Sequence, residues 1–492
     1  MGNIAEYLKA LDEADHDLEI VTDPAACAAF SNCNYSRVPA EAPEAIVYPT
    51  TSEQVQMVVQ KANEHEVNLV VRSSQGTETR NGSSLPAAGT KCVAVNLSKM
   101  NRIINIDPLN KMAIIEAGVT YGQLNDALKP YGLYVEHPLA PRAEKSVLAS
   151  LVDRDPVMTA KHLWDVPDPL CAVEMVMGKG RLFRSGSAAG PGTLDEMLEA
   201  GCGINQAQGP VWLDLARVIT GSQGTLAIVT WASVKVRPIG AVYSLTYVQS
   251  DDIDLLAKYA SNVIRRRLGE EAVILNRKGM RNVFGIEKEK AMAMPKWTYL
   301  SSARGFRYFP ETYMENQIED MAEIANGLGL ELKREVNGLS NTEVREVLDN
   351  TSASGEFWKT KDGKSGVDLF ILNTADKIGF YAALAEKAVA GCGLDPEDLV
   401  VYAQPSQMGR NCHIEFLVAA EKEKAEELEK ILSVTLLDNQ GFFSRPYGKI
   451  TGAVYDRYPD QKKYMPIMKE FFDKKKIMAP GRLCYLGTGK GV

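Results

Sequence analysis

The sequence lacks three features that would assign the chain to a class at once: a long apolar run, a basic charge balance and paired cysteines. No stretch approaches the 18 apolar residues of a membrane-spanning helix. The formal net charge of −8 argues against nucleic acid as a partner, because phosphate binding needs a basic face. The eight cysteines are scattered without a C-x-x-C pair, and the acidic N-terminal segment lacks the apolar core of a signal peptide. We therefore expect reduced thiols and a cytoplasmic location.

Residues 44–238 combine short β-branched runs with few helical patterns and are predicted to form one α+β unit. The clearest helix is expected within residues 50–65, where Thr or Ser provides an N-cap and Val55, Val58 and Val59 recur at helical spacing. A hairpin is expected to turn at Gly178–Gly180. Other strands are expected within residues 45–49, 67–73, 91–98, 101–108, 111–119 and 224–238, and a short helix within residues 121–132.

The remaining chain has a different pattern of predicted secondary structure. Residues 239–440 repeat strand–helix units, which predicts a sheet covered on one face by helices. Residues 1–43 are expected to form an N-terminal arm. Residues 441–492 are expected to return to the first unit, with a helical pattern that Pro480 and Gly481 stop.

Three segments rich in glycine and serine adjoin the predicted strands, at residues 70–86, 137–155 and 219–234. The first, VVRSSQGTETRNGSSLP, holds many more small donors than a surface turn needs. Small residues let a backbone approach an anion closely and point its N–H groups at phosphate oxygens. None of the segments has the G-x-G-x-x-G or Walker spacing, so neither a nicotinamide site nor a P-loop is supported. Each segment alone is consistent with an ordinary turn, but their combination and order indicate something else.

In this order the segments resemble the flavoprotein family of vanillyl-alcohol oxidase and 4-cresol (p-cresol) methylhydroxylase, together with the related D-lactate and glycolate dehydrogenases. The resemblance extends from about Ala42 to Arg482. It rests on five motifs: AIVYPTTSEQVQMVVQKANEHEVNLVVR, VAVNLSKMNRIINIDPLNKMAIIEAGVTYGQL, APRAEKSVLASLVDRD, RVITGSQGTLAIVT and DKKKIMAPGRL. It implies an α+β fold with a two-part FAD-binding domain of the p-cresol methylhydroxylase (PCMH) type. An α/β cap domain would then roof the flavin with its sheet.

The resemblance further implies that the first segment surrounds the FAD pyrophosphate, while the other two contact the flavin ring and the adenosine. The expected cofactor-binding residues are Ser73, Ser74, Gln75, Gly76, Thr77, Gly82, Pro141, Arg142, Ser146, Ser150, Asp153, Gly221, Gly224, Ile228 and Arg482. Members with covalent flavin often carry a histidine in the first loop, and this loop has none, so non-covalent FAD is expected. Leu148 and Ala149 stand where the family usually has a glycine pair. The lactate and glycolate branch would carry metal-binding histidines near His413, but one imidazole provides too few ligands, and no metal is expected.

Asp165 falls at the family's acidic residue close to flavin N5. Trp164 and two nearby prolines make a partly desolvated carboxylate with a raised pKa plausible. The alternative is that Asp165 only initiates the turn before Val166-Pro167. His162 is a weaker candidate for a general base, since an exposed loop histidine is the commoner outcome.

The segment FFSRPYGKI matches the part of the phenol-oxidising members that supplies a Tyr–Arg pair to bind a phenolate. Arg445 falls on the arginine, whereas Ser444 and Asn81 replace the two tyrosines. Tyr447 could restore a hydroxyl donor. A guanidinium pairs with either a phenolate or a carboxylate. The alternative for Arg445 is a surface salt bridge.

Asp165, Arg445 and Tyr447 are therefore the predicted catalytic residues of an FAD-linked oxidase or dehydrogenase of the vanillyl-alcohol oxidase type. The expected substrate is a small anionic molecule, similar to a 4-alkylphenol or aryl alcohol, that gives a hydride to flavin N5. Two alternatives stay open: a dehydrogenase of 2-hydroxy acids such as glycolate or D-lactate, and a non-catalytic FAD-binding subunit of a redox complex. The expected partners are the substrate, an electron-acceptor protein and further copies of the chain.

Overall fold

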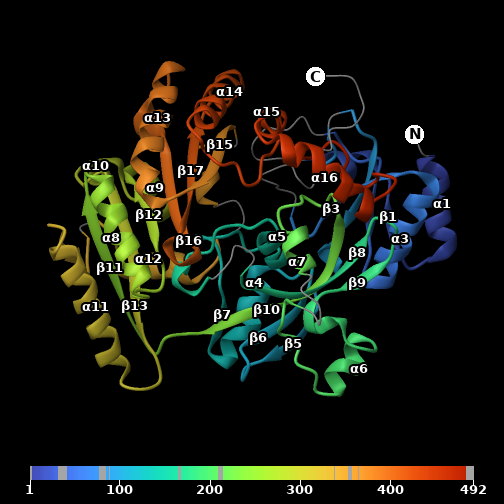
Figure 1. Ribbon diagram of the computed structural model, residues 1–492, viewed down its shortest axis with the longest axis horizontal. Helices are drawn as coiled ribbons and strands as arrows, with labels where there is room; N and C mark the ends of the chain where they lie inside the picture. The colour runs from blue at the N-terminus through green and yellow to red at the C-terminus, as the bar shows by residue number, and fades with distance from the viewer. Residues whose placement is uncertain are drawn as a thin grey trace.

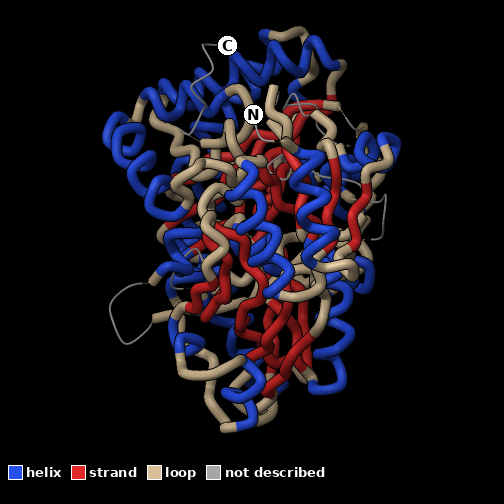
Figure 2. The backbone as a smooth tube through the Cα atoms, turned by 90° about the vertical axis from the view of Figure 1, so that its right-hand side faces the viewer, coloured by secondary structure: helices blue, strands red, loops and turns tan. Residues whose placement is uncertain are grey.

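Three β-sheets organise the chain in the computed structural model, which describes residues 3–31, 41–76, 85–87, 89–163, 168–208, 214–336, 338–352, 357–363 and 365–483. Two of the sheets lie in the right-hand half of Figure 1 and the third lies in the left-hand half. Figure 2 shows the strands stacked through the middle of the molecule, with helices outside them. The predicted α+β fold class is confirmed.

The first sheet is mostly parallel and has the order β1-β2-β4-β3. Its strands are β1 (Glu19–Val21), β2 (Ala45–Tyr48), β3 (Asn68–Arg72) and β4 (Cys92–Asn96). The predicted helix is confirmed as α3 (Ser52–His65), where the Thr51 side chain accepts from Gln54 N. The N-terminal residues also join this unit, because β1 pairs with β2 and the Tyr7 hydroxyl of α1 (Ile4–Ala14) donates to Val58 O of α3 at 3.2 Å. The following helix is α2 (Pro24–Phe30).

The second sheet has the order β5-β6-β10-β8-β9, with β7 paired to the far end of β10. Its strands are β5 (Ile103–Asp107), β6 (Met112–Glu116), β7 (Leu133–Val135), β8 (Leu170–Met177), β9 (Leu182–Arg184) and β10 (Ala227–Pro238). Its helices are α4 (Tyr121–Leu128), α5 (Val147–Val152), α6 (Leu194–Glu199) and α7 (Leu215–Ile219). The predicted hairpin is confirmed, since β8 pairs with β9 across the turn and Gly180 N donates to Met177 O.

The third sheet forms the unit that we call the cap, built from residues 242–438. Its order is β14-β11-β13-β12-β16-β17-β15. The strands are β11 (Val242–Ser250), β12 (Val273–Asn276), β13 (Trp297–Gly305), β14 (Leu332–Lys333), β15 (Gly366–Asn373), β16 (Val400–Ser406) and β17 (Asn411–Ala419). One face carries α8 (Ile253–Arg265), α11 (Pro310–Asn326), α13 (Ile378–Gly391) and α14 (Lys422–Asp438).

The sequence predicted helices on one face of this sheet only, but helices also cover part of the other face. Part of it packs against α9 (Arg277–Phe284), α10 (Lys288–Met292) and α12 (Asn341–Asp349). The rest of this face looks toward the two-sheet half (Figure 1). Residues alternate between the faces along β17, so Ile414 and Phe416 join the helix-covered core while His413 and Glu415 point the opposite way.

The C-terminal segment crosses back from the cap to the first sheet (Figure 1). It forms α15 (Ile450–Asp456) and α16 (Pro459–Phe472). The helical pattern ends earlier than Pro480, because residues 477–479 run beside β3. There Leu69 N donates to Ile477 O at 2.8 Å, and Ala479 N donates to Leu69 O at 2.7 Å. Within the described ranges, no helix combines the length and the apolar character needed to cross a bilayer.

Candidate active site

The first two glycine- and serine-rich segments meet directly. Ser146 N donates to Ser74 Oγ at 3.1 Å, and Gln75 N donates to Glu144 O at 3.0 Å. The backbone N–H groups of Ser73, Ser74 and Gly76 donate to no other described residue. A backbone amide without an internal partner is suited to bind an anion. The turn at residues 73–76 therefore provides a row of N–H donors such as a pyrophosphate requires.

The third segment meets the second one. Gly221 N donates to Val152 O at 2.7 Å, and the Arg154 guanidinium donates to Thr220 Oγ1 at 3.1 Å. Gly221 and Gly224 have φ values of +78° and +72°, which side-chain-bearing residues rarely adopt. A side chain at Gly224 would meet no described atom within 4 Å, so open space lies beside this turn. Three segments distant in sequence thus border one site.

A buried lysine ties the C-terminal helix to this site. Lys469 of α16 is 1% exposed, and its Nζ pairs with Asp473 Oδ2 at 2.8 Å. The same ammonium donates to Thr225 O of the third segment and to Met478 O beside β3, which leads into the first segment. Burial lowers the pKa of Lys469 and Asp473 raises it, with a lowered value as the result. We call Lys469 and Asp473 the C-terminal node.

The cap holds the second segment from the other side. Ser352 N donates to Pro141 O at 2.7 Å and Ser352 O accepts from Ala143 N at 3.1 Å. The indole Nε1 of Trp358 donates to Leu139 O at 3.0 Å. Residues 139–143 therefore have a position that is fixed jointly by both halves of the molecule.

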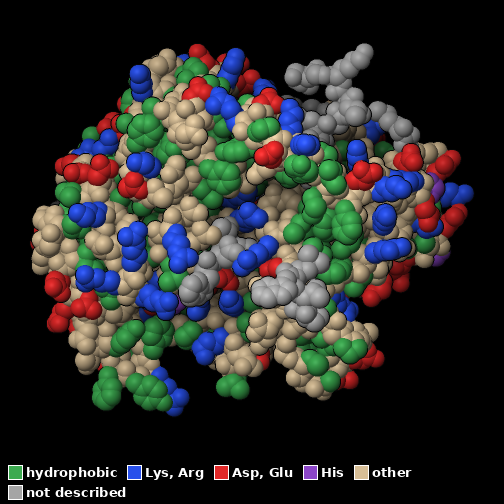
Figure 3. Space-filling view, viewed as in Figure 1, with side chains coloured by type: hydrophobic (Ala, Val, Ile, Leu, Met, Phe, Trp, Pro, Cys, Tyr) green, Lys and Arg blue, Asp and Glu red, His purple; other side chains and the backbone are tan. Residues whose placement is uncertain are grey.

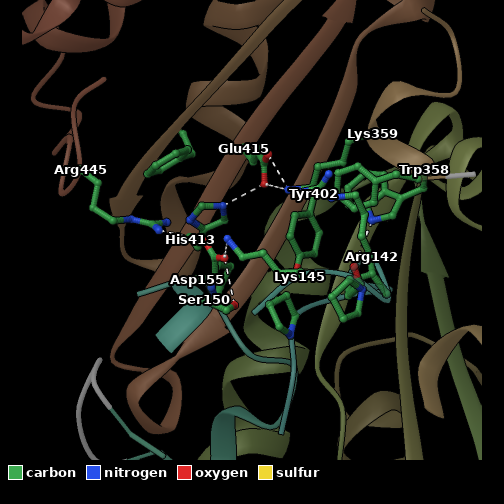
Figure 4. Close-up of a pocket in the computed structure, with 16 residues that line it drawn as sticks. Arg142, Lys145, Ser150, Asp155, Trp358, Lys359, Tyr402, His413, Glu415 and Arg445 are labelled. Atoms are coloured by element: carbon green, nitrogen blue, oxygen red, sulfur yellow. Dashed lines mark hydrogen bonds and ion pairs between the residues drawn. The ribbon is translucent and has the colours of Figure 1, made fainter. Parts of the chain in front are cut away.

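A cavity lies between the second segment and the cap sheet (Figure 4), with about 690 Å³ of atom-free space including its mouth. The described residues that line it are Pro138, Leu139, Pro141, Arg142, Lys145, Ser150, Asp155, Pro156, Phe357, Trp358, Lys359, Phe370, Tyr402, His413, Glu415 and Arg445. Three of the expected cofactor residues, Pro141, Arg142 and Ser150, thus lie on its floor. Four aromatic side chains of the cap form its walls.

Arg445 reaches this cavity from the C-terminal segment and is not a surface residue, being 4% exposed. Its Nη1 donates to Asp153 O and to Asp155 Oδ1, the latter at 3.0 Å. Its guanidinium carbon lies 4.5 Å from the centre of the Phe370 ring. Burial alone would lower the pKa of Arg445, but Tyr447, Asp155 and Asp153 raise it, so the group stays cationic. Nη2 donates to none of the described residues.

A buried polar chain on the cap side faces the same cavity. Lys359 Nζ donates to both carboxylate oxygens of Glu415, at 2.7 and 2.8 Å, and Glu415 lies 3.0 Å from His413 Nε2. Burial lowers the pKa of His413, more than Glu415 raises it. Because a neutral imidazole beside a carboxylate keeps its proton on the facing nitrogen, Nδ1 carries the lone pair. His413 is therefore equipped to accept a proton.

The cavity has a positive formal charge. Among the described residues that line it, four side chains are cationic and two are carboxylates, while His413 is neutral. On the face drawn in Figure 3, Lys and Arg side chains also gather near the border between the two halves. Lys145 is partly neutralised, since its Nζ lies 3.3 Å from Asp155 Oδ2. The excess of positive charge favours an anionic ligand.

Several expected residues are not brought to the cavity. Tyr447 is buried behind it, with its ring 6.3 Å from that of Phe370. Ile228 lies inside β10, and Arg482 donates to Leu85 O. Asp165, Thr77, Gly82, Trp164 and Asn81 lie outside the described residues.

His162 pairs with a buried carboxylate instead of facing the cavity. Its Nε2 lies 3.1 Å from Glu270 Oε2, and Lys161 pairs with the same carboxylate at 2.7 Å. Burial would raise the pKa of Glu270, but its bonds to His162 and Lys161 lower it to about 2. This geometry gives His162 a role at the boundary between the two halves.

The sequence reasoning missed the cap side of the site. His413 and Glu415 are two residues apart on β17, and such residues share one face of a strand. That spacing was a usable signal. Lys359, Trp358 and Tyr402 gave no comparable signal.

Comparison with known proteins supports the same architecture. Residues 43–186 match the FAD binding domain family. The 4-cresol dehydrogenase [hydroxylating] flavoprotein subunit of Pseudomonas putida is 36% identical over 157 residues, which cover 31% of this chain and 29% of the relative. A D-lactate dehydrogenase of Archaeoglobus fulgidus is 22% identical over 451 residues, or 89% of this chain and 90% of the relative. The Bacillus subtilis glycolate oxidase subunit is 25% identical over 46% of this chain and 44% of the relative.

The matched region thus spans about three tenths of the 4-cresol relative and less than half of the glycolate relative. Among solved structures, p-cresol methylhydroxylase with substrate bound has a TM-score of 0.84 and 19% identity, covering 99% of this chain and 98% of that one. The 4-ethylphenol oxidase of Gulosibacter chungangensis has a TM-score of 0.80 and 15% identity, covering 97% and 96%.

Residues 43–186 therefore match the FAD binding domain family, and the chain has the fold of p-cresol methylhydroxylase, so the resemblance predicted from the sequence is confirmed. The residues present fit FAD, because the backbone amides that follow β3 donate to no other residue in the described part of the chain, and Gly221 and Gly224 of the third segment have positive φ values. Mode of attachment and the individual cofactor contacts stay predictions.

Proposed function

We propose that this chain is an FAD-dependent oxidoreductase that dehydrogenates a small anionic substrate resembling a 4-alkylphenol or aryl alcohol. The observation that carries the proposal is the cavity, which combines excess cationic charge with aromatic walls. Phe370, Tyr402 and Trp358 give the cavity an aromatic lining that suits an aromatic substrate. Arg445 offers Nη2, which donates to none of the described residues, to the substrate's anionic oxygen.

Each group of residues would have a separate role in the reaction. FAD, when bound, supplies an acceptor for a hydride at N5. The amides of the first segment and residues 141–153 would hold it. Arg445 would fix the anionic end of the substrate. For an aryl alcohol, which keeps a proton on its alcohol oxygen, His413 would accept that proton at Nδ1 as the hydride leaves, while Glu415 and Lys359 keep the imidazole in that tautomer.

A 2-hydroxy acid is the second candidate. The likeness to a D-lactate dehydrogenase over 89% of this chain favours it. Its carboxylate could accept from Arg445, and His413 could accept the alcohol proton in the same way. The aromatic lining favours the phenolic candidate, because a compact hydroxy acid would contact less of it.

A subunit that binds FAD without catalysis is the third candidate, and it would need a partner in a redox complex. We also propose an electron-acceptor protein as a partner of the active enzyme, since one relative is named a flavoprotein subunit. The division into residues 44–238, 239–440 and a returning C-terminal segment remains part of this proposal.

The test is anaerobic mixing of the purified yellow protein with a panel of 4-alkylphenols, aryl alcohols and 2-hydroxy acids. Bleaching of the flavin absorbance by phenols supports the first candidate, and bleaching only by hydroxy acids supports the second. A yellow protein that none of them bleaches favours the non-catalytic subunit. A colourless protein that does not take up added FAD contradicts all three.

Arg445→Ala tests the role of the cation. Loss of a hydrogen bond to a charged group, worth about 1.5–3 kcal/mol, should weaken substrate binding about 10- to 100-fold. Because Arg445 also holds Asp155 and Asp153 O, flavin content and the thermal midpoint must be measured alongside. Arg457→Ala is the matched control, since Arg457 pairs with Asp438 at the surface of the same C-terminal segment. Unchanged substrate affinity in Arg445→Ala would remove the anion-binding role.

A further inference from the structure

Asp155 is the carboxylate at the end of the cavity where Arg445 lies. Its Oδ1 accepts from Arg445 Nη1 at 3.0 Å, and its Oδ2 lies 3.3 Å from Lys145 Nζ. Ser150 Oγ donates to the same Oδ2 at 3.0 Å. Asp155 therefore lies between the two cations and is a counter-ion to both (Figure 4).

The backbone on both sides of Asp155 fixes the position of this carboxylate. Arg154 has a φ of +58°, in the left-handed region that side-chain-bearing residues rarely adopt. The Arg154 guanidinium is anchored to Thr220 Oγ1 of the third segment at 3.1 Å. On the other side, Pro156 restricts Asp155 to extended conformations. Strained backbone of this kind is concentrated at functional sites, and here it directs Asp155 into the cavity.

Other charged side chains near the cavity add little charge at this end. Lys359 and Glu415 neutralise each other through hydrogen bonds of 2.7 and 2.8 Å. Burial and the neighbouring Arg142 lower the pKa of Arg72 to about 10, so Arg142 lies close to the start of the first segment. The Asp153 carboxyl group does not line the cavity, and burial raises its pKa, which favours its neutral form.

We propose that Asp155 restricts the substrate to one negative charge, an inference that rests on the proposed function. Arg445 and Lys145 carry two positive charges and Asp155 carries one negative charge, which leaves one positive charge at this end of the cavity. A single phenolate or carboxylate matches that charge. A second anionic group would meet Asp155 as a like charge, and the repulsion is weakly screened in a cavity of low dielectric constant. Asp155 is thus a specificity-determining residue that disfavours dianions.

The experiment compares two rigid probes of nearly equal size, terephthalate with two negative charges and its monoamide with one. Each probe is titrated into the FAD-loaded full chain by isothermal titration calorimetry. Wild type should bind the monoamide more tightly. Asp155→Asn should shift the ratio of the two dissociation constants about 10-fold toward terephthalate, which is the effect of one charge at roughly 10 Å and an effective dielectric constant of about 20. Lys145→Met removes a cation instead and should shift the ratio the opposite way.

The ratio of the two dissociation constants separates this role from a structural one. Loss of the bond between Asp155 and Arg445 would weaken both probes alike and leave the ratio unchanged. Asp155→Glu keeps the charge and should keep the wild-type preference, even where its altered geometry weakens both probes. Asp438→Asn is the matched control, because it removes a carboxylate that pairs with Arg457 at the surface, and it should change neither dissociation constant.

Three outcomes overturn the proposal: a wild type that prefers terephthalate, a wild type that binds neither probe, and a ratio that Asp155→Asn leaves unchanged. Flavin absorbance and the thermal midpoint show which variants are folded. If Asp155→Asn does not fold, an unchanged ratio in Lys145→Met overturns the proposal instead. Bleaching of the flavin by the substrate panel tests the proposed function separately. A bleached wild type with an unchanged ratio refutes only the role of Asp155, whereas a shifted ratio without bleaching refutes only catalysis.

Discussion

Replacing Lys469 by methionine should destabilise the chain strongly, because it leaves a buried carboxylate without its cation. Asp473 is 0% exposed, and its pair with Lys469 is 2.8 Å long. Breaking a buried pair by removing one partner costs about 3–5 kcal/mol. Asp473 keeps two backbone donors, Ile477 N at 3.2 Å and Met478 N at 2.8 Å, which favours the lower end of that range.

A loss of about 3 kcal/mol is a large part of a stability of about 5–15 kcal/mol. For a unit of about 200 residues it should lower the thermal midpoint by roughly 6–12 °C, from about 2–4 °C per kcal/mol. FAD should also dissociate faster, since the C-terminal node connects Thr225 in the third segment with Met478 beside β3. Thermal unfolding followed by circular dichroism and flavin release followed by fluorescence measure the two effects.

The decisive comparison is Lys469→Met/Asp473→Asn. Removing both charges leaves no unpaired ion in the interior, so the double variant should be more stable than Lys469→Met alone. The amide side chain that replaces the carboxylate would still offer an oxygen to Met478 N. If the single and double variants lose equal stability, the loss comes from packing and the electrostatic account of the node is wrong.

Two further predictions concern the cofactor and pH. Precipitation with trichloroacetic acid should release all of the yellow colour into the supernatant, because the flavin is expected to be non-covalent; colour kept in the pellet would reveal a covalent link. Burial lowers the pKa of both His137 and His413, so below about pH 6.5 the unfolded chain binds more protons than the folded one. The thermal midpoint should therefore fall as the pH drops from about 6.5 through the lowered folded-state values, and His137→Asn should flatten that slope; an equal slope in the variant would exclude His137 as a source.

The cofactor side of the site was predictable because its signals are local. Each segment expected to face the phosphates or the flavin follows a recognisable strand or helix, and small donors such as Ser73, Ser74 and Gly76 cluster within a few residues. Their order along the chain carried the family resemblance. The structure then brings Ser74 against Ser146 and Gly221 against Val152, as three segments around one ligand require.

The cap side of the cavity is built by contacts between residues far apart in the sequence, so it could not be predicted from local sequence patterns. Glu415 pairs with Lys359, which is 56 residues away, and this contact exists only after β15 has paired with β17. The alternation of His413 and Glu415 indicated a shared face, but not which face meets the cavity. The N-terminal residues present a similar case. The three-residue strand β1 is too short to leave a periodic signal, yet it becomes the edge of the first sheet.

Arg445 links the two sides energetically. Its Nη1 holds Asp153 O and Asp155 at the end of the second segment, while its guanidinium covers Phe370 of the cap. An anion that accepts from Nη2 must therefore share this cation with the segment expected to contact the flavin. Since neutralising one side of the guanidinium changes its hold on the other, substrate binding and the order of residues 153–155 should be thermodynamically coupled. By reciprocity, a substrate analogue that requires Arg445 should bind FAD-loaded protein and apoprotein with different affinities, and equal affinities for the two forms would show that Arg445 does not couple the two sites.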